Sequence, residues 1–221
     1  MKYNLALLLT FFTTISIAQL REGFVYAQDI IQDLDVELRY CNDDNFVGEQ
    51  IDGYNKEVVI MTTLAAKALK NVQDTLKKKG LGLKIYDAYR PQQAVNHFVR
   101  WAKQVNDTLK KQEYYPNVDK KNLFSQGYIA SKSRHSSGST VDLTIINLKT
   151  GKVLDMGSPY DFFGPESWVS NTKLTSKQQE NRQLLQHVML TNGFRNYPKE
   201  WWHFTLKGEP FKNQYFDFPV E

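Results

Sequence analysis

Cysteine is almost absent from this chain of 221 residues, because Cys41 is the only one. No disulfide can therefore form within the chain. Cys41 also lies too far from the N-terminus to be a lipid-attachment cysteine after a leader peptide, and a lone cysteine is most often a small packing residue. With 41% hydrophobic residues, the chain is long enough for one compact domain with a sizeable core.

Basic clusters, internal repeats and low-complexity tracts are missing too. The formal net charge is +4, and the basic residues are spread along the chain, so nothing in the charge pattern indicates binding to nucleic acid. One apolar run stands out, at residues 5–12. It is too short for a comfortable membrane span.

The N-terminus has the three parts of a secretory signal peptide. Lys2 precedes the apolar run, and Ser16 and Ala18 supply small residues at the −3 and −1 positions. We expect residues 1–18 to be cleaved off, which leaves a single catalytic domain at residues 19–221 that begins with Gln19. The mature protein would then be periplasmic or extracellular, with no stable membrane insertion. An uncleaved membrane anchor is the alternative.

Periodic apolar patterns predict both strands and helices. Strands are expected at residues 36–40, 83–87, 140–146 and 199–206, the third in a hairpin with residues 148–154. Helices are expected from a cap at Thr62 or Thr63 to Gly80, from Pro91 onward, and from a capping box of Ser176 and Gln179 to Gly193. Residues 42–54 and 109–130 are expected to be irregular. The elements do not alternate regularly, which favours the α+β class.

Residues 133–142 contain two potential metal ligands, His135 and Asp142. Seven extended residues span about 23–25 Å, whereas a bond to a metal is about 2 Å long, so the chain must fold back if both bind one ion. The serines around Gly138 suit such a turn. Asp142 then falls within an apolar, β-branched strand. A carboxylate buried there needs a partner, either a metal or an arginine.

Residues 199–206 supply a second histidine, His203, and a second carboxylate, Glu200. Two histidines and one aspartate leave a coordination position for water, which is typical of a catalytic zinc site. A glutamate that is near but not a ligand is the natural general base for that water. On a straight strand Glu200 faces away from His203, so it reaches the site only if the chain bends just before, as Pro198 allows. The alternative is a buried histidine and an exposed glutamate.

These stretches together are similar to the VanX-type D-alanyl-D-alanine dipeptidases, a family of zinc metallopeptidases. Residues 133–142 match the pattern Ser-x-His-x-x-Gly-Ser/Ala-x-x-Asp, and residues 200–203 match Glu-Trp-Trp-His. The resemblance extends from about Phe24 to Val220 and includes residues 86–91, 114–117, 156–162 and 215–220. The first motif is shared with D,D-carboxypeptidases and Hedgehog-like domains, whereas the whole set is specific to the dipeptidases.

The resemblance implies a fold and a metal site. The fold would be an antiparallel sheet flanked by helices, as in Hedgehog-like and D,D-peptidase zinc domains. One zinc ion per chain would be held on the sheet by His135, Asp142 and His203, with Glu200 as the general base.

Arg90 lies at the end of a predicted strand, just before Pro91. A fixed positive charge there can face a neighbouring cleft. The resemblance assigns Arg90 to the oxyanion of the tetrahedral intermediate. A surface arginine, or a partner for Asp87, is the alternative.

Three further residues would bind the substrate. The resemblance assigns Asp161 to the free ammonium group of a dipeptide, assisted by Tyr40 and Ser133. Judged on its own sequence context, Asp161 follows a Gly-Ser-Pro turn, where aspartate is usually only a turn former.

The function implied is hydrolysis of the small dipeptide D-Ala-D-Ala in cell-wall metabolism. A D,D-carboxypeptidase acting on longer peptidoglycan stems would use the same machinery. A non-catalytic zinc module that binds a partner is a third possibility. The presence of both Glu200 and Arg90 argues against that third possibility, since binding alone requires neither.

Overall fold

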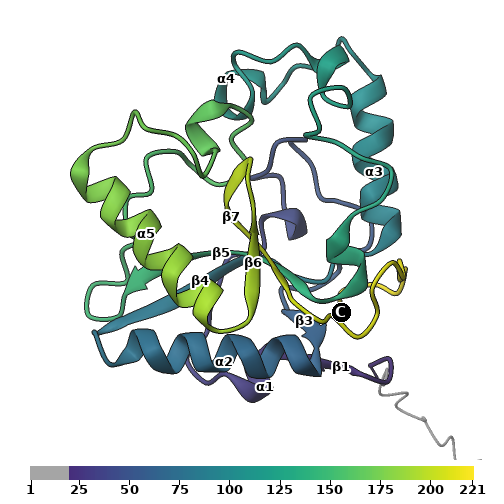
Figure 1. Ribbon diagram of the computed structural model, residues 1–221. Coiled ribbons are helices and arrows are strands. Elements are labelled where there is room, and N and C mark those ends of the chain that lie inside the picture. The colour runs from purple at the N-terminus through teal and green to yellow at the C-terminus, as the bar shows by residue number, and fades with distance from the viewer. Residues whose placement is uncertain (1–19) are drawn as a thin grey trace, which may run out of the picture.

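The computed structural model describes residues 20–221, and the predicted signal peptide lies outside the described residues. Five strands form the main sheet in the order β2-β4-β5-β7-β6 (Figure 1). They are β2 (Asp35–Val36), β4 (Leu81–Asp87), β5 (Thr140–Asn147), β6 (Phe194–Tyr197) and β7 (Glu200–Leu206). Within this sheet only the short β2 pairs in parallel, with β4. The predicted α+β class, with a mostly antiparallel sheet, is confirmed.

A second, two-stranded sheet joins β1 (Phe24–Tyr26) and β3 (Ile60–Thr62). The long helices are α2 (Thr63–Lys77), α3 (Gln92–Lys103) and α5 (Ser176–Thr191). Two single turns of α-helix are α1 (Ala27–Ile30) and α4 (Lys111–Tyr114). Four 3-10 turns complete the described chain: η1 (Arg39–Cys41), η2 (Lys120–Asn122), η3 (Arg134–Ser137) and η4 (Pro165–Ser167). No helix in residues 20–221 has the length and apolar character needed to cross a membrane.

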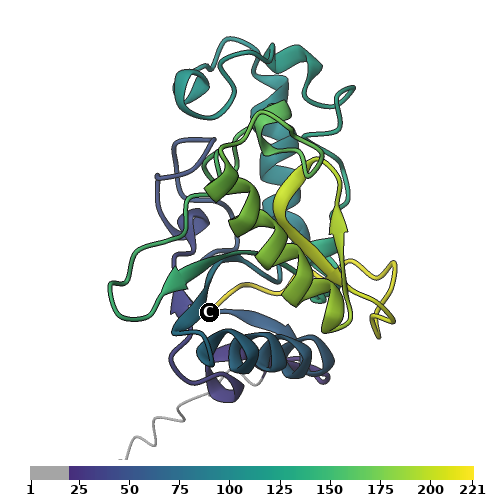
Figure 2. The ribbon, with the colours of Figure 1, turned by 60° about the vertical axis from the view of Figure 1, so that its left-hand side comes forward.

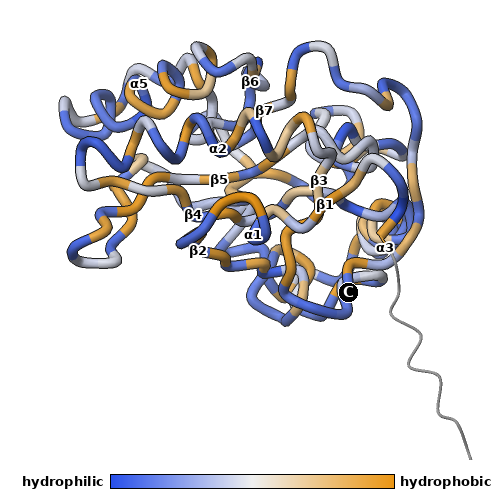
Figure 3. Tube along the Cα trace, turned by 90° about the horizontal axis from the view of Figure 1, so that it is seen from below, coloured by the Kyte–Doolittle hydropathy of each residue, from blue (hydrophilic) through white to orange (hydrophobic). Residues whose placement is uncertain are grey.

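Helices α2 and α5 cover one face of the main sheet (Figures 1 and 2). Hydrophilic residues interrupt the hydrophobic ones along both helices, as expected for elements with one buried side (Figure 3). Their apolar sides meet the buried side chains of Val141, Leu143 and Ile145 on β5. Asp142 and Thr144 therefore lie on the opposite face, as the alternation along the strand predicts.

The opposite face is covered by a second, aromatic core. Helix α3 contributes Phe98 and Trp101 to it, and the loop before β3 contributes Phe46 and Tyr54. The long connection from α3 to η3 lies over the same region and contains only short helical turns, α4 and η2. A cavity remains between this aromatic core and the sheet.

The observed helix starts agree with the predicted ones, except that the capping box of α5 lies one residue earlier. The Thr62 hydroxyl accepts a hydrogen bond from the amide of Ala65, so Thr62 is the cap of α2. The capping box of α5 consists of Thr175 and Gln178, one residue before the predicted pair. Thr175 and its neighbour can both cap a helix, and the pattern alone does not choose between them.

The predicted strand at residues 36–40 is wrong beyond Val36. Only Asp35 and Val36 pair with β4, and the chain then turns into η1. The apolar residues of this run pack in two different cores. Leu38 packs in the core between the sheet and helices α2 and α5, whereas Tyr40 packs in the aromatic core.

Candidate metal centre and active site

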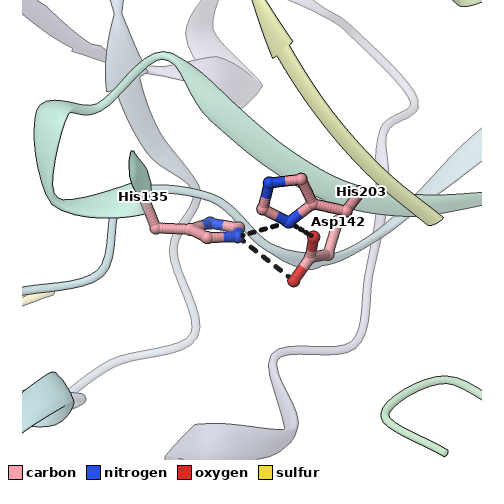
Figure 4. A group of neighbouring side chains, drawn as sticks. All are labelled: His135, Asp142 and His203. Carbon is pink, nitrogen blue, oxygen red and sulfur yellow. Dashed lines mark hydrogen bonds and ion pairs between the residues drawn. The ribbon is translucent and has the colours of Figure 1, made fainter. Parts of the chain in front are cut away.

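Three potential ligands meet on the face of the sheet that α2 and α5 leave uncovered. His135 Nε2 lies 3.3 Å from Asp142 Oδ2 and 3.2 Å from His203 Nδ1, and His203 Nδ1 lies 3.0 Å from Asp142 Oδ1 (Figure 4). The ligand atoms all lie within 4.8 Å of one another. The structure therefore brings together the three residues that the sequence proposes as one metal site.

Strand register and a glycine turn produce this meeting. Asp142 on β5 is directly opposite His203 on β7, so both side chains project from the same face. His135 lies on η3, and the chain folds back to β5 through Gly138, whose φ is 77°. A Cβ at Gly138 would lie 2.1 Å from the ring of Phe24, so both the backbone conformation and the packing require glycine.

The orientation of the side chains fits a divalent cation. His135 Nδ1 lies 2.7 Å from the carbonyl oxygen of Ala88, so Nδ1 carries the proton and Nε2 presents its lone pair to the other two ligands. Asp142 is buried, and its Oδ1 and Oδ2 lie 3.0 Å from His203 Nδ1 and 3.3 Å from His135 Nε2. Two imidazoles and a carboxylate that converge in this way are the donors that zinc prefers.

The charges in the site keep Asp142 ionised. Burial alone would raise the pKa of Asp142, but the two adjacent histidines outweigh burial and hold it well below its usual range. Burial alone would lower the pKa of His203, but the Asp142 carboxylate more than offsets this and raises it. A carboxylate that stays ionised is ready to bind a metal.

Glu200 reaches the site at the first position of β7. The pairing between β6 and β7 shifts in register next to Glu200, between Asn196 and Tyr197. This irregularity supplies the bend that Glu200 needs to reach the same site as His203. Its Oε2 lies 3.4 Å from His203 Nδ1. Burial, reinforced by the Asp142 charge, raises the pKa of Glu200 to about 7, although His203 and Arg90 act in the other direction. A carboxyl group with such a pKa can both accept and release a proton near neutral pH.

Arg90 lies three residues after the end of β4, beside His135, Asp142 and His203, which are called the metal set below. Its Nη2 is 3.6 Å from Asp142 Oδ2, and its guanidinium group lies over the rings of Tyr40 and Phe98. The buried carboxylate of Asp87 accepts a hydrogen bond from Arg90 Nε at 2.8 Å. Arg90 is therefore a fixed, largely buried cation within the site and not a surface arginine.

A further buried carboxylate, that of Asp161, lies beside Tyr40. Tyr40 donates a hydrogen bond of 2.8 Å to Asp161 Oδ2. Burial, followed by the Asp142 charge, raises the pKa of Asp161 well above its usual value. Its φ of 60° is unusual for a residue other than glycine, and such strain is common at functional sites. A cation placed next to Asp161 would stabilise its ionised form.

All eight residues proposed from the sequence line one cavity of about 260 Å³. Another wall of the cavity comes from Gly127, Tyr128, Ile129 and Ala130, in the long connection before η3. Ser133 lines the cavity as well, but its hydroxyl oxygen accepts a hydrogen bond of 3.3 Å from the amide of His135 and caps η3. Its proposed contact with substrate stays a prediction.

Comparison with known proteins places this chain in a family. The model of a peptidase family described as D-Ala-D-Ala dipeptidase matches residues 21–221. The chain belongs to this D-Ala-D-Ala dipeptidase family.

Three relatives that carry the name D-alanyl-D-alanine dipeptidase match over nearly their whole length. The relative from Enterococcus faecium is 40% identical over 90% of this chain and 98% of its own. The relative from Enterococcus faecalis is 39% identical, over 91% of this chain and 100% of its own. The relative from Streptomyces coelicolor is 38% identical, over 89% and 98%.

Two residues that contact the proposed site, Tyr160 and Tyr54, were not predicted from the sequence. Tyr160 is buried, and its hydroxyl lies 3.2 Å from Tyr40 Oη and 3.4 Å from Asp142 Oδ2, so it connects the Asp161 region to the metal set. Tyr54 donates a hydrogen bond to Asp87. Tyr160 directly precedes Asp161 in a segment that the family resemblance includes, which was an available signal. Tyr54 lies in a polar loop with no such signal.

Proposed function

We propose that this protein is a zinc-dependent dipeptidase that hydrolyses D-Ala-D-Ala to two molecules of D-alanine. The observation that supports it best is the convergence of His135, Asp142 and His203 beside Glu200, Arg90 and Asp161 in one small cavity. The family supplies the substrate class, since its relatives are D-alanyl-D-alanine dipeptidases. One zinc ion per chain would be held by the two histidines and Asp142.

Bound zinc would supply Lewis acidity to a water molecule and to the peptide carbonyl group. Glu200, whose Oε2 lies 3.4 Å from His203 Nδ1, accepts a proton from the attacking water and later donates it to the leaving amine. Arg90 provides a fixed positive charge for the oxygen that becomes negative in the tetrahedral intermediate. Its position is held by Asp87 before substrate arrives, so little reorganisation is needed during the reaction.

The other end of the substrate would be recognised through its ammonium group. Asp161 is the buried anion for that group, and Tyr40 orients the carboxylate by its hydrogen bond to Oδ2. Ser133, which lines the same cavity, would assist. A peptide with an acylated amine would leave Asp161 buried without a cation, which is costly. This arrangement favours a free dipeptide over a longer stem peptide.

We also propose that the protein works outside the cytoplasmic membrane, where its dipeptidase activity would serve D-alanine recycling or cell-wall turnover. Support comes from the basic start, the apolar run and the small residues before Gln19. N-terminal sequencing of the protein from fractionated cells checks this proposal. An intact Met1 in the cytosolic fraction would contradict it.

One assay tests the catalytic proposal. Purified protein is incubated with D-Ala-D-Ala, with N-acetyl-D-Ala-D-Ala and with a stem pentapeptide, each with and without a zinc chelator. We expect release of D-alanine from the free dipeptide only, abolished by the chelator and restored by zinc. Equal cleavage of the pentapeptide would indicate a D,D-carboxypeptidase, and no cleavage of any substrate would contradict the enzymatic proposal.

A further inference from the structure

Glu209 is a buried carboxylate that the proposed reaction does not use. It lies in the segment after β7, and its side chain is only 1% exposed. Its Oε1 is 3.0 Å from Arg134 Nη1 and 3.2 Å from Arg195 Nη2, and its Oε2 accepts a hydrogen bond of 2.7 Å from the hydroxyl of Ser137. Burial of a carboxylate is costly unless the charge is paired. Here two guanidinium groups and one hydroxyl group pair with Glu209.

Two of these donors flank a proposed zinc ligand. Arg134 directly precedes His135 on η3, and Ser137 follows it by two residues. A single 3-10 turn has weak hydrogen-bond geometry of its own, so its shape depends on the contacts around it. The His135 ring is held from one side by the carbonyl of Ala88, and Glu209 holds both ends of the turn from the segment after β7.

The third donor, Arg195, lies on the strand next to the one that carries His203. Arg195 lies on β6, where it is paired with Thr205 of β7. Thr205 is two residues from His203, on the same side of that strand. Glu209 therefore connects the turn that carries His135 to the pair of strands that carries His203.

We propose that Glu209 is a positioning residue that fixes His135 relative to His203 and thereby sets the affinity of the site for zinc. This inference rests on the proposed zinc site. Zinc bonds have defined lengths and a tetrahedral arrangement, so a ligand that shifts weakens binding even when it is still present. Loss of outer-shell partners of metal ligands typically costs about 10–100-fold in affinity.

The test measures the zinc dissociation constant by competition with a chromogenic chelator, in the full-length mature protein. Glu209→Gln keeps the shape but removes the charge, and its amide hydrogens must face a guanidinium group or the Ser137 hydroxyl. We expect the dissociation constant to rise about 10-fold or more. Arg195→Gln removes only the contact between Glu209 and β6, so it should raise the zinc dissociation constant less than Glu209→Gln does. In the double variant it should raise the constant little beyond the value for Glu209→Gln.

Glu37→Gln is the matched control. Glu37 is also a carboxylate between two cations, Lys84 and Arg39, but it contacts none of the proposed zinc ligands. This variant should lose stability and keep wild-type zinc affinity.

The outcomes separate the inference from the proposed function. A wild-type protein that binds no zinc would contradict the zinc site itself. Wild-type zinc affinity in folded Glu209→Gln would overturn the positioning role alone. If Glu209→Gln does not fold, unchanged zinc affinity in Arg195→Gln would overturn it equally. An equal loss of affinity in Glu37→Gln would assign the effect to general destabilisation and would also contradict the inference.

Discussion

Arg90 and Asp87 form a buried ion pair in which Nε and Nη2 of the guanidinium both lie 2.8 Å from Asp87 Oδ2. Asp87 Oδ1 accepts a further hydrogen bond from the hydroxyl of Tyr54. The sequence left three interpretations for Arg90: a surface arginine, a partner for Asp87 or a cation for the reaction. Burial of Arg90 rules out the first. The geometry makes the other two compatible, because guanidinium has five donors and Asp87 engages one edge of the group.

Replacement of Arg90 by lysine tests this dual use. A lysine ammonium is a point charge on a flexible stem, so it cannot pair with Asp87 and also present a fixed fork of donors to the cavity. We expect kcat/KM for D-Ala-D-Ala to fall by about 10²–10³-fold, the cost of losing one oxyanion donor. Zinc content should stay at the wild-type level. Arg100→Lys, which alters an exposed pair with Asp52, is the control and should retain activity.

Removal of the metal or of one ligand should abolish activity in proportion to the zinc lost. His203→Ala and wild-type protein dialysed against chelator are compared by elemental analysis and by D-alanine release. Both should contain far less than one zinc per chain, and only the dialysed wild type should recover activity when zinc is added. His187→Ala, which removes an exposed histidine of α5, is the matched control. Full zinc content in His203→Ala would show that His203 is not a ligand.

Asp161→Asn should change which substrates are accepted. The buried carboxylate is expected to pair with the substrate ammonium, and an unpaired buried group costs about 1–3 kcal/mol or more. We therefore expect a higher KM for D-Ala-D-Ala, and a smaller preference over N-acetyl-D-Ala-D-Ala than in the wild type. Steady-state kinetics with both peptides decide the matter. An unchanged preference would remove Asp161 from the ammonium site.

The ion pairs of Glu37 with Lys84 and Arg39 are expected to make stability depend on pH. Burial alone would raise the pKa of Glu37, but hydrogen bonds from Lys84 and Arg39 outweigh burial and lower it. A lowered folded-state pKa stabilises the protein above the unfolded-state value and loses that effect as pH falls through the folded value. Glu37→Gln should therefore unfold in less urea than wild type at pH 7, and the difference should shrink below about pH 4. A constant difference would contradict the pairing.

Local chemistry explains which parts of the site the sequence revealed. Gly138 is required by its backbone conformation and by its contact with Phe24, so the fold-back between His135 and Asp142 is encoded in a few residues. The face on which Asp142 lies follows from alternation along β5. Both features depend on near neighbours in the sequence, where patterns are informative.

Long-range contacts explain what the sequence did not reveal. The alternating run at residues 36–40 is typical of a strand, yet Tyr40 has to leave the sheet to reach Asp161, 121 residues away. Glu209 is one glutamate in an irregular segment, and its role depends on three donors from η3 and β6. No periodicity marks such a residue before the fold is known.

Glu200→Gln separates catalysis from zinc binding. Glu200 is held at the start of β7 by the buried side chains of Trp201 and Trp202, and its Oε2 lies 3.4 Å from His203 Nδ1. Glutamine keeps the shape but cannot accept the proton of the attacking water. Loss of a general base typically costs roughly 10²–10⁴-fold, so kcat should fall by at least that range, with zinc content and melting temperature near wild type.

Glu200→Asp supplies the companion measurement for the same residue. It keeps the base but shortens its reach by one methylene group, and misplacement on this scale costs about 10²-fold. The aspartate variant should therefore be impaired but exceed the glutamine variant in kcat. Near-normal turnover in zinc-loaded Glu200→Gln would mean that another group accepts the proton. Asp161 and Asp142 line the same cavity, but Asp142 is committed to the metal set, and Asp161 would be the carboxylate to replace next.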